Sequence, residues 1–165
     1  MNADLPDFHI PHMEKIEWMV ETKGWAIETV PAGSFAFADG RPLPTYSYTV
    51  NFLSRFGMPE IVILGLTPVA CSGIFDMIAD VCASGQTIDV DATVTGLFDG
   101  DQRARFMPID VAGRAEMFAT ACAWHSRTPA LELQIVQMLW PDRNGFLPGE
   151  SGFDQRLLFT QPILD

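Results

Sequence analysis

Apolar residues recur with helical periodicity in three segments, which predicts three helices. The first covers residues 12–23 and is followed by Gly24, a residue suited to the left-handed stop of a helix. The second covers residues 68–83, with Thr67 as N-cap and a proline at its first position. The third follows Asp110, whose carboxylate can cap it. The apolar stripes are Met13, Ile16, Met19 and Val20; Cys71, Ile74, Phe75, Ile78 and Cys82; and Val111, Ala115, Phe118 and Cys122.

Alternating or β-branched apolar residues predict strands between these helices. Asp99 and Gly100 predict a hairpin turn between two of them. The segment 60–66 is apolar on both faces, so we expect it in the centre of the sheet. The strands are expected over residues 25–30, 45–50, 60–66, 93–98, 103–109 and 131–140.

This order of elements predicts an α+β fold with a largely antiparallel sheet packed by about three helices. The strands outnumber the helices that could cross over between parallel strands. The length of 165 residues fits a single domain over residues 1–165. We expect residues 1–11 to form a mobile N-terminal segment. Residues 141–165 are rich in proline and glycine, and we expect this tail to pack across the surface.

The chain is strongly acidic, with a net charge of −11 at pH 7 and only two lysines, Lys15 and Lys23. Its arginines are scattered rather than clustered, which disfavours nucleic acid and anionic membranes as partners. A basic protein or a cationic small molecule is electrostatically easier to accept. The same acidity also serves solubility without any partner.

Neither a membrane span nor a signal peptide is predicted. The longest apolar run, residues 61–66, is far too short to cross a bilayer. Residues 1–11 contain Asp4 and Asp7 but no lysine or arginine, the opposite of a signal peptide. We therefore expect a cytoplasmic protein.

No metal or cofactor site is predicted. The three cysteines, Cys71, Cys82 and Cys122, are odd in number and not closely paired, so we expect free thiols. His9 and His12 have a spacing that metal sites use on helices, but Pro11 lies between them and surface or capping roles are favoured.

His125 follows the third predicted helix and is open to two interpretations. It has the residue type of a general base. It also suits the C-terminal end of a helix, where the helix dipole favours a positive charge, and this second role is favoured.

Motifs of the best-known enzyme classes are absent from the sequence. There is no phosphate-binding glycine loop after a strand and no nucleophile elbow. Trp140-Pro141-Asp142 invites comparison with the acid loop of tyrosine phosphatases, which also need an arginine at a set distance after a cysteine. Arg127 lies one position too close to Cys122, so we reject that chemistry.

Four short motifs stand out in the sequence: Gly24-Trp25, Tyr48-Thr49-Val50, Pro59-Glu60-Ile61-Val62 and Trp140-Pro141-Asp142-Arg143-Asn144-Gly145. In this order and spacing they resemble the bacterial family called domain of unknown function 4262, from about residue 24 to residue 162. The sequence departs from the usual family pattern at Asn51-Phe52, in place of Gly-Leu, and at Pro148-Gly149, in place of Pro-Trp. If these positions line a family site, this member has altered it. The resemblance implies fold and compartment more than an activity.

Aromatic and polar residues near strand ends are the candidate binding residues, because small-molecule pockets combine apolar walls with a few polar groups. In this hypothesis Asp142 or Glu60 acts as acid or base, and Arg143 binds an anionic group. The alternative for Asp142 to Gly145 is a tight turn, with Asn144 and Gly145 supplying left-handed residues. In either case we expect Arg143 to contact a carboxylate or a backbone carbonyl. The candidate binding residues are Tyr46, Tyr48, Asn51, Glu60, Trp140, Asp142 and Arg143.

Two functions follow as hypotheses. The acidic surface and the missing catalytic motifs favour a non-enzymatic binding or interaction protein, such as an adaptor or an immunity-like protein for a basic partner. The alternative is a small enzyme or ligand carrier with a pocket between the Tyr48 strand and the Trp140 turn.

Overall fold

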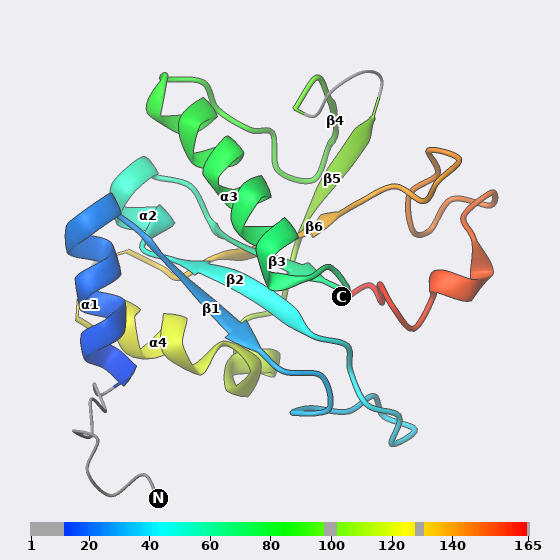
Figure 1. Ribbon diagram of the computed structural model, residues 1–165, viewed down its shortest axis with the longest axis horizontal. Coiled ribbons are helices and arrows are strands. Elements are labelled where there is room, and N and C mark those ends of the chain that lie inside the picture. Colours follow the sequence, from blue (N-terminus) through cyan, green and yellow to red (C-terminus); the bar gives the residue numbers. More distant parts are fainter. Residues whose placement is uncertain (1–11, 98–101, 128–130, 165) are drawn as a thin grey trace, which may run out of the picture.

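A computed structural model describes residues 12–97, 102–127 and 131–164. Six strands form one sheet in the order β1-β2-β3-β6-β5-β4, as Figure 1 shows. The β3–β6 pair is parallel, whereas the other four pairs are antiparallel, so the predicted α+β fold with a largely antiparallel sheet is confirmed. The strands are β1 (Ala26–Val30), β2 (Tyr46–Val50), β3 (Glu60–Leu64), β4 (Thr93–Thr95), β5 (Arg103–Pro108) and β6 (Ile135–Leu139). The helices are α1 (His12–Lys23), α2 (Phe52–Phe56), α3 (Pro68–Ala83) and α4 (Ala119–His125), with shorter 3-10 helices η1 (Ala112–Phe118) and η2 (Gln155–Leu157).

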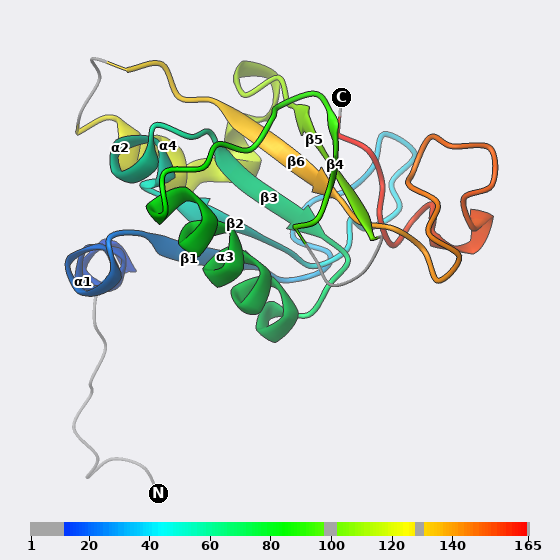
Figure 2. The same ribbon diagram turned by 90° about the horizontal axis from the view of Figure 1, so that it is seen from above.

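The sheet separates two apolar cores. Tyr46 pairs with Leu64 and Tyr48 with Val62, and these side chains share the face that α1 and α4 cover. The alternate residues of β3 face α3 on the opposite side. Figure 2 shows α3 and α4 on opposite sides of the sheet. Alternating side chains thus bury both faces of the central strand, as its apolar sequence predicts.

The helix α3 has the predicted bounds and the predicted start. Thr67 Oγ1 accepts a hydrogen bond from the backbone N–H of Ala70 at 3.2 Å, and Pro68 occupies the first helical position. Phe75 lies mid-helix and is fully buried together with Cys71 and Ile78. Local capping signals and the apolar stripe therefore agree with the tertiary packing.

The prediction of one continuous helix after Asp110 is wrong, although its cap is present. Asp110 Oδ1 accepts from the backbone N–H of Gly113 at 3.2 Å. The segment then divides into η1 and α4, with non-helical backbone angles at Arg114 (φ −129°, ψ 22°) and at Phe118 (φ −122°, ψ 38°). The Tyr46 hydroxyl, from β2, donates to the Met117 carbonyl at 2.7 Å. A side chain of the sheet thus provides the hydrogen-bond donor for a backbone carbonyl at this break.

The last strand is shorter than the predicted segment 131–140. Glu60, the first residue of β3, pairs with Ile135, and on the other side β5 ends at Pro108 opposite Val136. A proline has no N–H to continue the ladder. Beyond Pro108 the Ile109 N–H still donates to the Ile135 carbonyl, and the Glu60 N–H donates to the Gln134 carbonyl. No described strand pairs with residues 131–134, and Leu131 is 49 % exposed.

The tail after Trp140 does more than cover the surface. The buried side chain of Gln137 donates to the Pro162 carbonyl and accepts from the Leu164 N–H, each at 2.7 Å. Leu164 packs in the same core as Tyr46. The prediction of a surface tail is thus wrong for the last described residues, because a polar side chain in the middle of the sheet anchors them. The predicted turn at residues 99–100 and the predicted mobile segment 1–11 lie outside the described residues.

Candidate functional site

The predicted binding residues do not form one pocket. Asn51 and Glu60 lie where β2 ends and β3 begins. Trp140 lies at the other end, because its indole Nε1 donates at 2.9 Å to the carbonyl of Leu64, the last residue of β3. Four residue steps separate Glu60 from Leu64, about 13 Å along an extended strand. The structure therefore divides the candidate residues into two groups and does not bring the Tyr48 strand and the Trp140 turn together.

The two tyrosines are core residues. Both rings are 1 % exposed and pack edge-on against Phe118. The Tyr46 hydroxyl donates to the Met117 carbonyl, and the Tyr48 hydroxyl accepts from the Thr120 N–H at 3.3 Å. Burial raises the pKa of Tyr48 to about 12 and that of Tyr46 further. Both hydroxyls are protonated and engaged at neutral pH, so they brace the break between η1 and α4.

Asn51 joins three parts of the chain. Its backbone is left-handed, with φ at +78°, a conformation that asparagine tolerates better than most residues. Its Nδ2 donates to the Gly24 carbonyl at 3.0 Å, and its Oδ1 accepts from Trp124 Nε1 at 2.9 Å. The amide thus ties the start of β1 and the helix α4 to the end of β2.

Glu60 is a buried carboxylate with three donors. It accepts from the Thr49 hydroxyl at 2.8 Å and from the N–H groups of Phe52 and Leu53 at 3.0 and 3.1 Å. Burial raises the pKa of Glu60 to about 7, against the lowering effect of these hydrogen bonds. The carboxylate therefore holds the chain where it turns from β2 into α2.

The space beside Glu60 is too small for a substrate. Asn51, Trp124 and His125 line it, and its volume is about 10 Å³. A volume of this size holds about one water molecule. His125 lies in the last turn of α4, the helix end at which the sequence places it.

Trp140 is held by hydrogen bonds of both its side chain and its backbone. Its indole reaches Leu64, as described above, and its backbone N–H and carbonyl bond the side-chain amide of Gln161 at 2.7 and 2.9 Å. Gln161 is 1 % exposed. Just after β6, the side chain of Gln161 in the tail therefore takes the place of a neighbouring strand as the hydrogen-bond partner of the backbone.

Asp142 organises the turn that follows. Its Oδ1 accepts from the N–H groups of Asn144 and Phe146, and its Oδ2 accepts from that of Asp154. Burial alone would raise the pKa of Asp142, but these N–H groups lower it overall. Every oxygen of this carboxylate is engaged, which is the arrangement of a structural turn.

The turn itself is confirmed, with one correction. Gly145 donates its N–H to the Asp142 carbonyl at 3.0 Å and has a φ of +86°. Asn144 does not take the left-handed conformation expected of it, since only Asn51 and Asp91 do so among the described non-glycine residues. One glycine suffices because the side chain of Asp142 already bonds the Asn144 N–H.

Arg143 is exposed, and the expectation that it contacts a carboxylate or a backbone carbonyl is wrong. Within the described part of the chain it makes no hydrogen bond or ion pair. Its charge acts at longer range on Asp154, whose pKa is lowered by Arg156 and, to a smaller extent, by Arg143. Two hollows, of about 380 and 440 Å³, adjoin the Trp140–Arg143 segment.

Comparison with known proteins identifies the family. The family described as "Domain of unknown function (DUF4262)" matches residues 19–154. The chain belongs to this family. No curated protein and no solved structure matches the chain. Membership in DUF4262 explains the shared motifs but assigns no activity.

The resemblance described above implies a glycine at the position of Asn51, and the backbone conformation at this position fits either residue. The backbone there is left-handed, which glycine adopts without steric cost and asparagine tolerates. The departure therefore preserves the conformation while adding the contacts to Gly24 and Trp124. Gly149, at the second departure, also has a positive φ, of +91°.

The sequence did not predict the hydrogen-bond partners of the candidate residues, chiefly Trp124, which bonds Asn51, and Gln161, which bonds Trp140. They lie 73 and 21 positions from the residues they bond, so no local pattern reveals them. It also did not predict a role for Glu28, which accepts from the Thr120 hydroxyl at 2.6 Å and bonds His12. Glu28 is the only charged residue of β1, and this is the one signal that marks it in the sequence.

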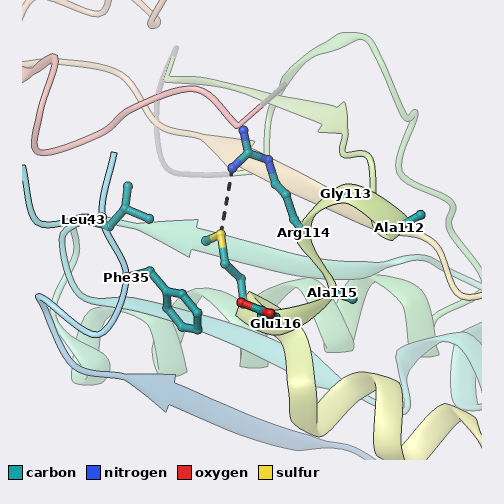
Figure 3. Close-up of a pocket in the computed structure, with 9 residues that line it drawn as sticks. Phe35, Leu43, Ala112, Gly113, Arg114, Ala115 and Glu116 are labelled. Atoms are coloured by element: carbon teal, nitrogen blue, oxygen red, sulfur yellow. Dashed lines mark hydrogen bonds between the residues drawn. The ribbon is translucent and has the colours of Figure 1, made fainter. Parts of the chain in front are cut away.

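Another hollow, of about 420 Å³, lies between Phe35 and Leu43 on one side and η1 on the other (Figure 3). Arg114 and Glu116 both line it, so its charged side chains are of opposite sign. Arg114 Nη1 lies 4.0 Å from the sulfur of Met117. In the described ranges no group of three or more His, Cys, Asp and Glu side chains is placed to hold a metal ion. No helix of these ranges is long and apolar enough to span a membrane.

Proposed function

We propose that the protein is a non-enzymatic binding protein of the bacterial cytoplasm, with an adaptor-like or immunity-like role toward a positively charged protein. Three free cysteines, Cys71, Cys82 and Cys122, support a reducing compartment. The surroundings of the two candidate acid–base groups, Glu60 and Asp142, support binding over catalysis. A general acid or base needs a substrate within hydrogen-bond reach. Glu60 instead faces a space of about 10 Å³, and Asp142 has all its oxygens engaged by backbone N–H groups.

The observation that carries the proposal is the imbalance of unpaired surface charge. Most cations are neutralised within the protein: Lys23, Arg41, Arg103, Arg105, Arg127 and Arg156 each pair with a carboxylate. Lys15, Arg55 and Arg143 form no such pair with a described residue. A larger set of exposed carboxylates is left without an ion pair to any residue of the described ranges: Glu14, Glu21, Asp80, Asp89, Asp110, Glu116 and Glu132.

This imbalance favours a partner of opposite charge. Unpaired surface carboxylates raise the rate of encounter with a basic protein and oppose encounter with acidic ones. The pocket required by the alternative function, an enzyme or ligand carrier, loses its geometric support because Glu60 and Trp140 lie at opposite ends of β3. A small molecule retained in a native mass spectrum of the purified protein would nevertheless favour that alternative.

Affinity capture from the native host tests the proposal. The wild type is compared with a variant carrying Glu14→Gln, Glu21→Gln, Asp80→Asn and Asp89→Asn. The matched control neutralises the unpaired cations with Lys15→Gln, Arg55→Gln and Arg143→Gln. We expect the wild type and the control to recover one basic protein in stoichiometric amount, and the acid-neutralised variant to recover less.

Salt provides a second criterion. Recovery of the basic protein is expected to fall when the ionic strength is raised to about 0.5 M, because exposed charges are then screened. Failure to recover any stoichiometric partner at low and at physiological salt would contradict the proposal. So would equal recovery by the wild type and the acid-neutralised variant.

A further inference from the structure

A groove opens at the end of the sheet where β6 begins. Its volume is about 580 Å³, within the range of roughly 300–1,000 Å³ typical of small-molecule sites. Pro59, which precedes β3, and Pro108, at the end of β5, form part of it. The groove lies at the opposite end of β6 from the Trp140 turn, so it is distinct from the hollows beside Arg143.

The walls of this groove are largely apolar. Val90, Val111 and Leu133 line it, and Val90 is 39 % exposed. The nearby backbone groups are already used: the Gln134 carbonyl accepts from Glu60 N–H, and the Ile135 carbonyl accepts from Ile109 N–H. A bound molecule would therefore be recognised through apolar contact and through the charged side chains of the lining.

Those charged side chains are of one sign. Asp110 and Glu132 are both exposed carboxylates, and neither forms an ion pair with a described residue. Asp110 uses Oδ1 to accept from the Gly113 N–H, and no described donor bonds its Oδ2. The hollow in Figure 3, by contrast, is lined by Arg114 as well as Glu116, and those next to Trp140 are lined by Arg143 as well as Asp142. Among these hollows, the groove alone combines apolar walls with carboxylates and no cation.

We propose that this groove binds a small molecule with an apolar body and one amine cation. The apolar body lies against Val90, Val111 and Leu133, and the ammonium group lies between Asp110 and Glu132. Apolar contact supplies affinity, and the two carboxylates supply selectivity for the charge of the ligand. The inference goes beyond the proposed function, because it concerns a small ligand and does not require the protein partner to exist.

A pair of probes that differ only in charge tests the site. 4-Phenylbutylammonium and 4-phenylbutanoate share an apolar body, and their binding to the full chain is followed by NMR chemical shifts and calorimetry. We expect saturable binding of the ammonium and binding of the carboxylate that is weaker by about tenfold or more, a difference equivalent to about 1.4 kcal/mol. Unsaturable shifts with the ammonium, or equal binding of both probes, would overturn the proposal.

Variants locate the binding. Asp110→Asn with Glu132→Gln removes both carboxylates, while asparagine keeps the cap on Gly113. This double variant is expected to lose about tenfold in affinity for the ammonium, from two partly screened charge contacts. Val90→Arg, which places a cation in the groove, is expected to abolish binding. The control Glu14→Gln with Glu21→Gln removes the same charge from α1 and is expected to bind like the wild type.

The outcomes separate a site from general attraction to an acidic protein. If the α1 control weakens ammonium binding as much as the groove variant does, the binding is non-specific and the proposal fails. Thermal unfolding of each variant shows that it is folded, and chemical shifts of residues such as Val111 report directly on the groove. Loss of the protein partner in the capture experiment leaves this result unaffected, since the probes are titrated into the purified protein in the absence of any partner.

Discussion

The indole N–H of Trp124 donates to the side-chain oxygen of Asn51 at 2.9 Å, across 73 positions of sequence. The other end of the same amide bonds the Gly24 carbonyl. One side chain at the end of β2 thus fixes both the helix α4 and the approach to β1. The left-handed backbone of Asn51 is what points its amide to both partners.

Replacement of Asn51 separates its backbone role from its side-chain role. Asn51→Gly keeps the left-handed backbone but leaves Trp124 without its acceptor, so we expect a loss of about 1–2 kcal/mol in the free energy of unfolding. Asn51→Ala adds the strain of a left-handed alanine, about 1 kcal/mol more. Chemical denaturation measures both values. If Trp124→Phe costs as much in the Asn51→Gly background as in the wild type, the hydrogen bond contributes nothing.

The stability of the protein is expected to depend on the ionisation of Glu60. Burial raises the pKa of this carboxyl from 4.5 to about 7 in the folded state. Between these values the folded protein holds a proton that the unfolded chain has lost, so stability falls as the pH rises from about 4.5 to about 7 and then levels off. Glu60→Gln is expected to flatten this fall, as measured by denaturation across the same pH range. Identical slopes for the two proteins would exclude Glu60 as their source.

Two substitutions in the turn after Trp140 are expected to change the free energy of unfolding by very different amounts. Gly145 has a φ of +86°, and no heavy atom lies within 4 Å of the place a Cβ would occupy. Gly145→Val is therefore expected to cost about 1–3 kcal/mol from backbone strain alone. Arg143→Ala removes a side chain with no hydrogen bond to a described residue, and we expect a change below about 0.5 kcal/mol. A larger effect of Arg143→Ala would reveal a structural contact.

The core under α3 is tested by a pair of helix positions. Phe75 is fully buried and Val69 is 84 % exposed. Phe75→Ala is expected to lower the free energy of unfolding by about 3–5 kcal/mol, because it removes buried apolar area and leaves a cavity. Val69→Ala, on the same helix, is expected to change it by less than about 0.5 kcal/mol. Similar melting shifts for both variants would mean that the packed face has been misassigned.

The sequence by itself determined the elements whose signals are local. The helix α3 has its predicted bounds because a capping threonine, a proline at the first position and an apolar stripe all lie within the segment. The signals for the strand β3, which is buried on both faces, and for the glycine of the Asp142 turn also lie within their own short segments, so both were predictable. The third helix was predicted as continuous, whereas the structure divides it into η1 and α4, where the Met117 carbonyl bonds Tyr46 of β2. The last strand was predicted too long, because its pairing with β3 and β5 begins only at Ile135. Both differences depend on distant segments of the chain.

The arrangement of the candidate site was decided by the tertiary structure alone. A sequence pattern shows that Tyr48, Glu60 and Trp140 lie in or beside strands, but not the order or direction of those strands. Because β6 runs parallel to β3, the end of β6 lies beside Leu64 and away from Glu60. Strand order and direction depend on how whole apolar faces pack together, so residues that look like one site in the sequence were placed at opposite ends of the sheet.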